Sequence, residues 1–178
     1  MSSPVKIETE NFWIRSLTIQ DADSRLVQWL NDQEMQDALN LPKLDMTPEK
    51  LRQFIVSFNN RNNYILGIFS KAEDTIIGFY TIDVNLQHQV GHLTTAIGDK
   101  NFWGKNIMPE IILAIRDYFF ANTQVEKLSA RVLAKNRRVL FNFIGSPDFP
   151  FEARLVKECR APDGKRLDLL IFSAIKNS

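Results

Sequence analysis

The segment GDKNFWGKNI, at residues 98–107, contains residue types that can bind a phosphate group. It follows a β-branched run and precedes an apolar helical pattern, so free backbone N–H groups are expected at a helix N-terminus, where an anion is favoured. Gly104 would let the backbone approach a phosphate closely, and Lys105 would add positive charge. The alternative is a connecting loop with an exposed lysine, because short motifs of this kind also occur by chance.

Two helices are expected ahead of this loop. The polar run TIQDADS supplies capping oxygens before Leu26, Val27 and Leu30, which recur at helical spacing. Thr47 followed by Pro48 is typical of a helix start, and the apolar residues after it repeat at i, i+3, i+4 and i+7. Both patterns therefore predict amphipathic helices in the first third of the chain.

Strands account for most of the remaining chain. A first strand is expected at 12–17, and the runs YILGIFS, TIIGFYTIDV and VGHLTTAI predict an antiparallel meander of three strands. After the loop, a helix with Pro109 in its first turn precedes the alternating strand KLSARVL and a short helix, RRVLFNFI. The runs FEARLVKECRA and RLDLLIFSAI predict a hairpin around APDG. This order predicts an α/β (α+β) chain with about seven strands.

Length and composition limit the possible classes of protein. At 178 residues the chain is expected to form one domain, 1–178, with a flexible N-terminus at 1–10. The net charge of +1 does not favour nucleic acid as a partner. The single cysteine, Cys159, excludes an intramolecular disulfide and a four-thiolate zinc site, and no metal is expected. Without a recognisable signal peptide or a long apolar stretch, we expect a cytoplasmic protein with no membrane partner.

The loop, the order of elements and an asparagine after the next strand resemble a known family. The segment IGDKNFWGKNI is similar to the pyrophosphate loop of the GNAT N-acetyltransferases, especially the branch of ribosomal-protein alanine and spermidine acetyltransferases, over about residues 12–175. The resemblance implies a single domain with a mixed, mostly antiparallel central sheet flanked by helices, and acetyl-CoA as cosubstrate. The cofactor-binding residues that it implies are Ile97 on the strand beside the pantetheine, Trp103, Gly104, Lys105, Asn106 and Ile107 at the phosphates, and Asn136.

Two of these positions need separate interpretation. Asn106 stands where the family usually has its second glycine, and asparagine is the non-glycine residue that best tolerates a left-handed backbone, so the loop is expected to keep its shape. Asn136 either contacts the pantetheine or a water, as the resemblance implies, or is the N-cap of the helix that follows. The two roles of Asn136 are compatible.

The resemblance also implies a catalytic base. The strand HLTTAIG is similar to the family pattern E-L-G-x-x-I-G, which places His92 where a glutamate often acts as base. An imidazole with an ordinary pKa of about 6.5 can accept the amine proton directly or through water. The alternative is a strand histidine with a structural hydrogen bond.

The acid that would protonate the leaving thiolate has no obvious counterpart in the sequence. The family positions that carry a serine or a tyrosine are Val139 and Phe143 here, and neither side chain can donate a proton. Water, Tyr118 or another hydroxyl would have to replace them, or the protein binds the cofactor without turnover.

Charge is unevenly distributed along the chain. Residues 100–140 contain eight Lys or Arg and three acidic residues, whereas residues 21–50 contain seven acidic residues and three Lys or Arg. A basic region suits cofactor phosphates, and an acidic region would attract a cationic amine. The alternative is a set of solvated helix faces.

The sequence therefore predicts an acetyl-CoA-dependent N-acetyltransferase that acts by direct attack of a primary amine, either of a small molecule or of a protein N-terminus. Two other functions stay open. A non-catalytic acyl-CoA-binding regulatory module would explain Val139, Phe143 and Asn106. A protein for another nucleotide fits less well, because the chain lacks both G-x-x-x-x-G-K-[ST] and G-x-G-x-x-G. The terminal hairpin could pair across a homodimer.

Overall fold

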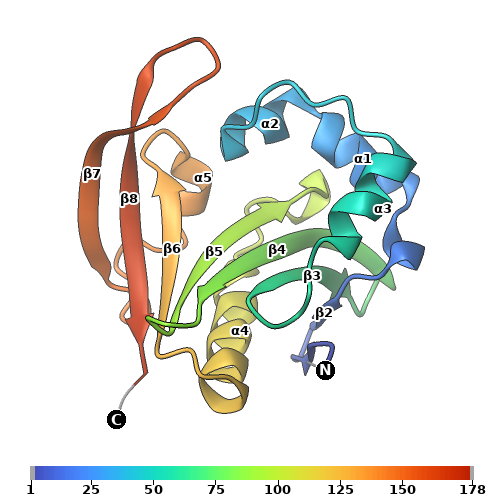
Figure 1. Cartoon of the computed structure of the whole chain (residues 1–178), viewed down its shortest axis with the longest axis horizontal. Coiled ribbons are helices and arrows are strands. Elements are labelled where there is room, and N and C mark those ends of the chain that lie inside the picture. The colour runs from blue at the N-terminus through green and yellow to red at the C-terminus, as the bar shows by residue number, and fades with distance from the viewer. Residues whose placement is uncertain (1–2, 177–178) are drawn as a thin grey trace.

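The computed structural model describes residues 3–176 of the 178-residue chain (Figure 1). The strands are β1 (Lys6–Glu8), β2 (Phe12–Ser16), β3 (Asn63–Ser70), β4 (Thr75–Asn85), β5 (Val90–Ile97), β6 (Lys127–Leu133), β7 (Phe151–Arg160) and β8 (Arg166–Ile175). The α-helices are α1 (Ser24–Asn31), α2 (Gln33–Leu39), α3 (Pro48–Val56), α4 (Met108–Asn122) and α5 (Arg137–Leu140). Two short 3-10 helices are η1 (Ile19–Asp21) and η2 (Lys100–Phe102).

The strands form one sheet in the order β1-β2-β3-β4-β5-β6-β8-β7. Neighbouring strands pair antiparallel except β5 and β6, which are parallel. The predicted meander is β3, β4 and β5, and the predicted terminal hairpin is β7 and β8; both are confirmed. The expected mixed, mostly antiparallel sheet is therefore present.

The described part of the chain contains eight strands in this sheet rather than about seven. The additional strand is β1, which pairs antiparallel with β2. Val5 and Ile7 are buried, with only 2% and 8% of their surface area exposed. The expectation of a flexible segment at 1–10 is wrong for β1, because these apolar side chains anchor it; residues 1 and 2 lie outside the described residues.

Strands β5 and β6 are paired over only part of their lengths. Their parallel register ends at Leu93 opposite Ala130. Beyond that row β5 continues beside β4 to Ile97, whereas β6 continues beside β8 to Leu133. The two strands therefore separate, and the sheet opens between them (Figure 1). This opening, between Leu93–Ile97 of β5 and Ala130–Leu133 of β6, is called the V below.

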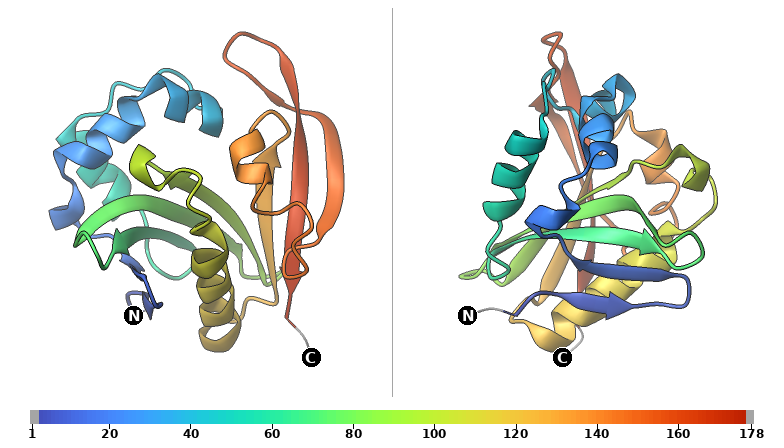
Figure 2. Two further views of the ribbon diagram at one scale, coloured as in Figure 1. Left: turned by 180° about the vertical axis from the view of Figure 1, so that it is seen from behind. Right: turned by 90° about the vertical axis from the view of Figure 1, so that its right-hand side faces the viewer.

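Helices cover both faces of the sheet, and each face has its own hydrophobic core (Figure 2). On one face, Ile111, Ile115 and Phe119 of α4 join the larger cluster of buried side chains. On the other face, Leu26 of α1 and Leu51 of α3 belong to a second cluster. The V therefore lies between two packed layers, in a sheet that is rigid on either side of it.

Capping residues define the helices ahead of β3. Thr47 accepts a hydrogen bond from a first-turn amide at 3.3 Å and Pro48 occupies the first turn, which confirms the predicted start of α3. The other predicted helix is divided, because Asp23 caps α1 and Asp32 caps α2. The division turns α2 toward the open end of the V (Figure 1).

Three chemical features of the described residues complete the fold. No helix within residues 3–176 is long and apolar enough to cross a membrane. The same residues contain no group of three or more His, Cys, Asp or Glu that could hold a metal ion. Cys159 is a free, half-buried thiol on β7.

Candidate active site

The loop between β5 and α4 has a backbone shape suited to binding a phosphate. Gly104 has a φ of +76° and Asn106 a φ of +54°, both in the left-handed region, which confirms that Asn106 tolerates this conformation. Among the described residues, no heavy atom beyond the chain neighbours lies within 4 Å of a Cβ placed on Gly104. The N-cap of α4, Ile107, gives no side-chain hydrogen bond to the first turn, so the amides there are available to an anion.

A cavity of about 360 Å³, called the outer cavity, joins this loop to two other elements. Its walls come from α2, from the end of β5 with the loop, and from α5 with the turn after it. Six of the seven predicted cofactor-binding residues line it: Ile97, Trp103, Gly104, Asn106, Ile107 and Asn136. Lys105 does not, and its Nζ lies 4.9 Å from the centroid of the Phe102 ring. Residues far apart in the sequence thus converge on one space.

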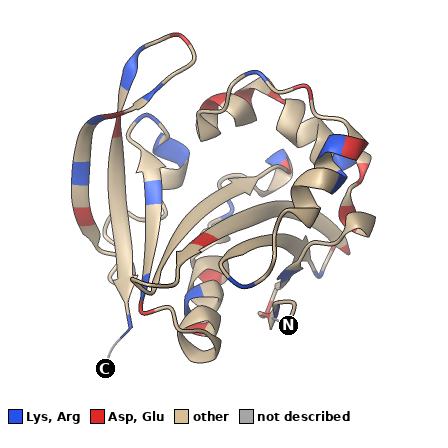
Figure 3. Cartoon of the chain, in the orientation of Figure 1, with Lys and Arg blue, Asp and Glu red and all other residues tan. Residues whose placement is uncertain are grey.

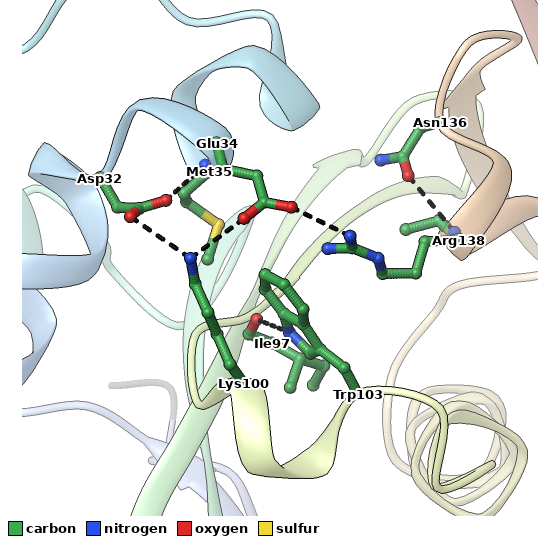
Figure 4. Close-up of polar contacts among 9 residues, drawn as sticks. Asp32, Glu34, Met35, Ile97, Lys100, Trp103, Asn136 and Arg138 are labelled. Carbon is green, nitrogen blue, oxygen red and sulfur yellow. Dashed lines mark hydrogen bonds and ion pairs between the residues drawn. The ribbon is translucent and has the colours of Figure 1, made fainter.

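Trp103 connects the loop wall of the outer cavity with the α5 wall (Figure 4). Its Nε1 donates a hydrogen bond to the carbonyl oxygen of Ile97 at 2.8 Å, which ties the loop to β5. The guanidinium carbon of Arg138 lies 3.9 Å from the ring centroid, and Nζ of Lys100 lies 5.1 Å from it. Both cations are within the range of a cation–π interaction, so the indole also links the loop to α5.

Glu34, at the start of α2, bridges the same two cations across the outer cavity (Figure 4). Its carboxylate accepts hydrogen bonds from Lys100 Nζ at 3.0 Å and from Arg138 Nη2 at 2.9 Å. Hydrogen bonds from Lys100 and Arg138 lower the pKa of Glu34, which keeps the carboxylate ionised at neutral pH. A phosphate group of a ligand would find the same two partners at this place.

The uneven charge seen in the sequence is reflected around the outer cavity. Figure 3 shows basic residues on α5 opposite the acidic start of α2. Sequence reasoning identified the excess of cations over residues 100–140 but did not single out Lys100, Arg138 or Glu34 as site residues. The charge count was the available signal; the pairing of Glu34 with two cations required the fold.

A second cavity of about 170 Å³, called the inner cavity, lies in the V. The two cavities adjoin, because they share the lining residues Ala38, Leu39, Thr95, Asn136 and Val139. The inner cavity continues past them to Tyr80 on β4, Leu93 on β5 and Ala130 on β6. The two adjoining cavities therefore extend from the loop between β5 and α4 to the point where the two parallel strands separate.

Asn136 stands where the two cavities meet. Its Oδ1 accepts a hydrogen bond from Val139 N at 3.3 Å, which confirms the predicted role as N-cap of α5. Its Nδ2 donates to the carbonyl oxygen of Ala38 at 3.3 Å and so links α5 to α2. Because Asn136 lines both cavities, its amide is also placed to meet a ligand that passes between them.

His92 lies on β5 just before the V, in the row that contains Asp83 of β4 and Ser129 of β6. It lines neither the outer nor the inner cavity. Its Nδ1 is buried and has no hydrogen-bond partner among the described residues. Burial is the main cause of its lowered pKa, and the charge of Arg131 adds to the effect. A neutral imidazole is therefore favoured at this position.

The residues considered for the leaving-group acid lie in different places. Val139 lines both cavities, and Phe143 lines the inner cavity while it packs between Phe149 and Phe172 with 3% of its area exposed. Tyr118, on α4, lines neither cavity. Sequence reasoning missed Tyr80, whose hydroxyl is buried at the inner cavity, because a tyrosine within an apolar strand pattern is indistinguishable from an ordinary core residue.

A sheet that opens between two parallel strands, with a cavity leading from a helix N-terminus into the opening, defines a protein built to hold an elongated, phosphate-bearing ligand. The chain belongs to the GNAT acetyltransferase family: the model of the acetyltransferase (GNAT) domain matches residues 11–140. The recognition made from IGDKNFWGKNI is thereby confirmed, as is the fold class.

Other proteins are similar to this one over nearly the whole chain. An uncharacterized N-acetyltransferase, p20, of Bacillus licheniformis is 26% identical over 94% of both chains. The ribosomal-protein-S5-alanine acetyltransferase of Vibrio fischeri has a TM-score of 0.82 at 19% identity, with 98% of both chains covered. The spermidine N-acetyltransferase of Vibrio cholerae, solved with CoA and spermine, has a TM-score of 0.80 at 16% identity, covering 93% of this chain and 96% of that one. At these identities the two structures show a shared fold.

Proposed function

We propose that the protein is an acetyl-CoA-dependent N-acetyltransferase that moves the acetyl group to a primary amine by direct attack in a ternary complex. The observation that carries the proposal is that the outer and inner cavities adjoin and together extend from the loop at 98–107 into the V. A cofactor with its phosphates at the loop would extend its thioester into the V. The family and the CoA-bound neighbour support the same cosubstrate.

Most of the residues around the cavities bind the cofactor in this proposal. The backbone of Trp103–Ile107 and the first turn of α4 hold the pyrophosphate, and Lys105 contributes charge from the rim. Lys100 and Arg138 exchange Glu34 for cofactor phosphate. Ile97 lies beside the pantetheine, and Asn136 contacts it where the cavities meet.

His92 is the proposed general base. Because His92 lines neither cavity, a water would carry the proton from the amine to the imidazole. The lowered pKa keeps the imidazole neutral, and thus able to accept that proton, at neutral pH.

The proposed acceptor is a primary amine, of a small molecule or a protein N-terminus. Two structural neighbours are named for spermidine and for a ribosomal-protein alanine, which are both amine acceptors. Of the acidic residues of 21–50, Glu34 lines the outer cavity and Asp32 lies 3.6 Å from Lys100 beside it. Negative charge at this side of the site would attract a cationic amine.

Calorimetric titration tests the cofactor assignment. We expect acetyl-CoA to bind at micromolar concentration, CoA without its 3′-phosphate to bind less tightly, and ATP to bind weakly. Gly104→Pro should abolish binding, because proline cannot adopt the positive φ of Gly104. Absence of acetyl-CoA binding at millimolar concentration would reduce the family membership to a statement about fold.

Turnover is then measured as free thiol released from acetyl-CoA with a panel of polyamines, amino sugars and peptides. Amine-dependent thiol release, lowered in His92→Ala, is the expected result. A non-catalytic acyl-CoA-binding module is the second candidate, favoured by the lack of a hydroxyl at Val139 and Phe143. Tight binding of acetyl-CoA with no thiol release for any amine would select the second candidate.

A further inference from the structure

Buried polar atoms without hydrogen-bond partners gather at the V. Within the described residues these side-chain atoms are Asn40 Oδ1, Tyr80 Oη and His92 Nδ1. Asn40 and Tyr80 both line the inner cavity, and His92 lies just before the V. Buried polar groups in folded proteins are almost always paired, so the two unpaired atoms that line the inner cavity, Asn40 Oδ1 and Tyr80 Oη, indicate partners that a bound ligand or water supplies.

Tyr80 is the most deeply placed of the three. Its side chain is 1% exposed and belongs to the core cluster on the α4 face of the sheet. It lies opposite Thr95 on β5, beside the V. The Thr95 hydroxyl lies near enough to Tyr80 Oη to oppose the effect of burial on the pKa of Tyr80, but it donates its own hydrogen to the carbonyl oxygen of Phe79 at 3.4 Å and forms no well-oriented hydrogen bond with Tyr80. The phenolic hydrogen of Tyr80 is therefore free to be donated to a group in the inner cavity.

The polarity of the inner cavity suits the two reactants. Asn40 Nδ2 donates to the carbonyl oxygen of Arg160 at 3.1 Å, which fixes the amide and leaves Oδ1 as an acceptor. An acceptor amine brings N–H donors, whereas a thioester carbonyl brings only an acceptor and needs a donor. Among the donors that line this cavity, Tyr80 carries a buried hydroxyl without a hydrogen-bond partner in the described part of the chain, so it is the donor assigned to the thioester.

We propose that Tyr80 is a catalytic residue that donates a hydrogen bond to the carbonyl oxygen of the acyl thioester bound in the V. The proposal rests on the proposed acetyltransferase function. As the amine nitrogen attacks, the C–N bond forms and the carbonyl π electrons move to the oxygen, whose negative charge the Tyr80 hydroxyl stabilises. Collapse of this intermediate restores the carbonyl group and breaks the C–S bond, leaving the electron pair on the sulfur of CoA.

The proton lost by the amine balances the proton that the thiolate gains through water, so Tyr80 keeps its own hydrogen throughout. Burial raises the pKa of Tyr80, which suits a group that donates a hydrogen bond and does not ionise. The assignment also accounts for Val139 and Phe143: the charge is stabilised at oxygen, and water is sufficient to protonate the thiolate.

The test compares Tyr80→Phe with Tyr64→Phe as a matched control. Tyr64 is 5% exposed in the same core cluster, but its hydroxyl donates to the carbonyl oxygen of Arg61 at 2.9 Å and it lines neither the outer nor the inner cavity. We expect Tyr80→Phe to lower kcat about 100-fold, with KM for acetyl-CoA changed less than about twofold. Tyr64→Phe should leave both constants unchanged. An unchanged kcat in Tyr80→Phe would overturn the proposal.

A spectroscopic measurement does not depend on turnover. Isotope-edited infrared spectra of acetyl-CoA labelled with ¹³C at the carbonyl should show the bound carbonyl band at lower frequency than in Tyr80→Phe, because the hydrogen bond weakens the C=O bond. Identical bands would overturn the assignment. If the wild-type protein binds acetyl-CoA but acetylates no amine, the band still decides the Tyr80 contact, and the failure belongs to the proposed function. If acetyl-CoA does not bind, both are overturned.

Protein stability gives a further distinguishing result. Removing an unpaired buried hydroxyl loses no hydrogen bond, so Tyr80→Phe should unfold at the same temperature as the wild type or a higher one. Tyr64→Phe should unfold at a lower temperature, because it breaks the hydrogen bond to Arg61. A marked loss of stability in Tyr80→Phe would show that the hydroxyl has a structural partner and would contradict the assignment.

Discussion

At the scale of single residues, the surroundings of His92 decide which protonation state it holds. Burial and then the charge of Arg131 lower its pKa, Asp83 raises it and Lys127 lowers it. The balance keeps the folded protein's imidazole neutral at a lower pH than in an unfolded chain. A neutral imidazole at neutral pH is the form that a general base requires.

We expect kcat/KM to rise with pH along a limb whose apparent pKa lies below 6.5, because the neutral imidazole becomes more populated as the proton leaves. A primary amine substrate loses its proton at a pH far above this range. The limb of the pH profile that belongs to the amine is therefore separable from the limb that belongs to His92. The His92→Gln variant should lose the lower limb and fall about 100-fold in rate above it. The pH–rate profile of purified enzyme measures both effects.

The matched control is His88→Gln, since His88 is exposed in the turn between β4 and β5. Its profile should match that of the wild type. Persistence of the lower limb in His92→Gln would assign that proton to another group.

Glu34 competes with the proposed cofactor phosphates for Lys100 and Arg138. Glu34→Gln removes the competing charge, so we expect acetyl-CoA to bind up to about fivefold more tightly, the range of an exposed ion pair. Calorimetry at low and high salt measures the change, which should shrink as salt screens the charges.

Glu49→Gln provides the control for Glu34→Gln. Glu49 is exposed on α3, where its carboxylate lies 3.4 Å from Arg52, and it lines neither the outer nor the inner cavity. Its substitution changes the net charge equally and should leave affinity unchanged. Weaker binding in Glu34→Gln would mean that the carboxylate supports the bound state.

At the scale of elements, the loop between β5 and α4 depends on two left-handed residues. Gly104→Ala should lower the free energy of unfolding by about 1 kcal/mol and weaken acetyl-CoA binding, because a Cβ strains the backbone at a φ of +76°. Asn106→Gly should retain affinity, since glycine adopts the same φ without strain. Urea unfolding and calorimetry on both variants measure these opposite responses. Equal losses in the two variants would refute the backbone explanation.

The junction of β5 with the same loop is held by close packing against α1. A Cβ placed on Gly98 would lie inside the ring of Trp29, so a larger residue must displace the indole. We expect Gly98→Ala to destabilise the fold by about 1–3 kcal/mol, as overpacking generally does. Denaturant unfolding measures the cost, and Trp29→Leu in the same chain should recover part of it. If the losses of stability in Gly98→Ala and Trp29→Leu simply add in the double variant, the Trp29 ring is not what a Cβ at position 98 meets.

The elements could be predicted where their signals are local in sequence. Thr47 and Pro48 mark α3, apolar β-branched and aromatic runs mark β3 to β5, and alternation marks β6. The glycine-containing loop was recognisable because its chemistry lies in ten consecutive residues. β1 was missed because three residues are too few to show a period. The split between α1 and α2 was missed because Asp32 is equally compatible with a continuous helix.

The candidate site was predictable only in part for the same physical reason. Most of the predicted cofactor-binding residues, Trp103–Ile107, follow one another along the loop, whereas Tyr80, Glu34 and Arg138 meet the site through tertiary structure. A single tyrosine among apolar strand residues has no sequence signal for an unpaired hydroxyl. The orphaned polar atoms became visible only when burial and hydrogen bonding were known.

At the scale of the whole molecule, the V separates two parts of the sheet, β1 to β5 and β6 to β8. Across it, Asn40 reaches Arg160 and Glu34 reaches Arg138. A ligand in both cavities would add contacts to each part and bind only the folded chain. We expect acetyl-CoA at 100 times its Kd to stabilise the protein by about 2.7 kcal/mol, seen as a higher unfolding temperature.

Hydrogen exchange locates this stabilisation. Amides of β5 beyond Leu93 and of β6 beyond Ala130 should become more protected with acetyl-CoA, while those of β1 and β2 should change only with global stability. Protection confined to one side of the V would contradict binding between the strands.

The arrangement of the strands along the chain also bears on how the protein folds. Four pairs of strands, β1–β2, β3–β4, β4–β5 and β7–β8, are joined by short connections and form as hairpins. The other three pairs are joined by long connections: helices α1 to α3 lie between β2 and β3, α4 lies between β5 and β6, and α5 with β7 lies between β6 and β8. Pairing across a longer stretch of chain has a larger entropic cost, so these three rows should form after the hairpins. The site of the proposed chemistry, between β5 and β6, is thus completed only after the hairpins on either side of it have formed.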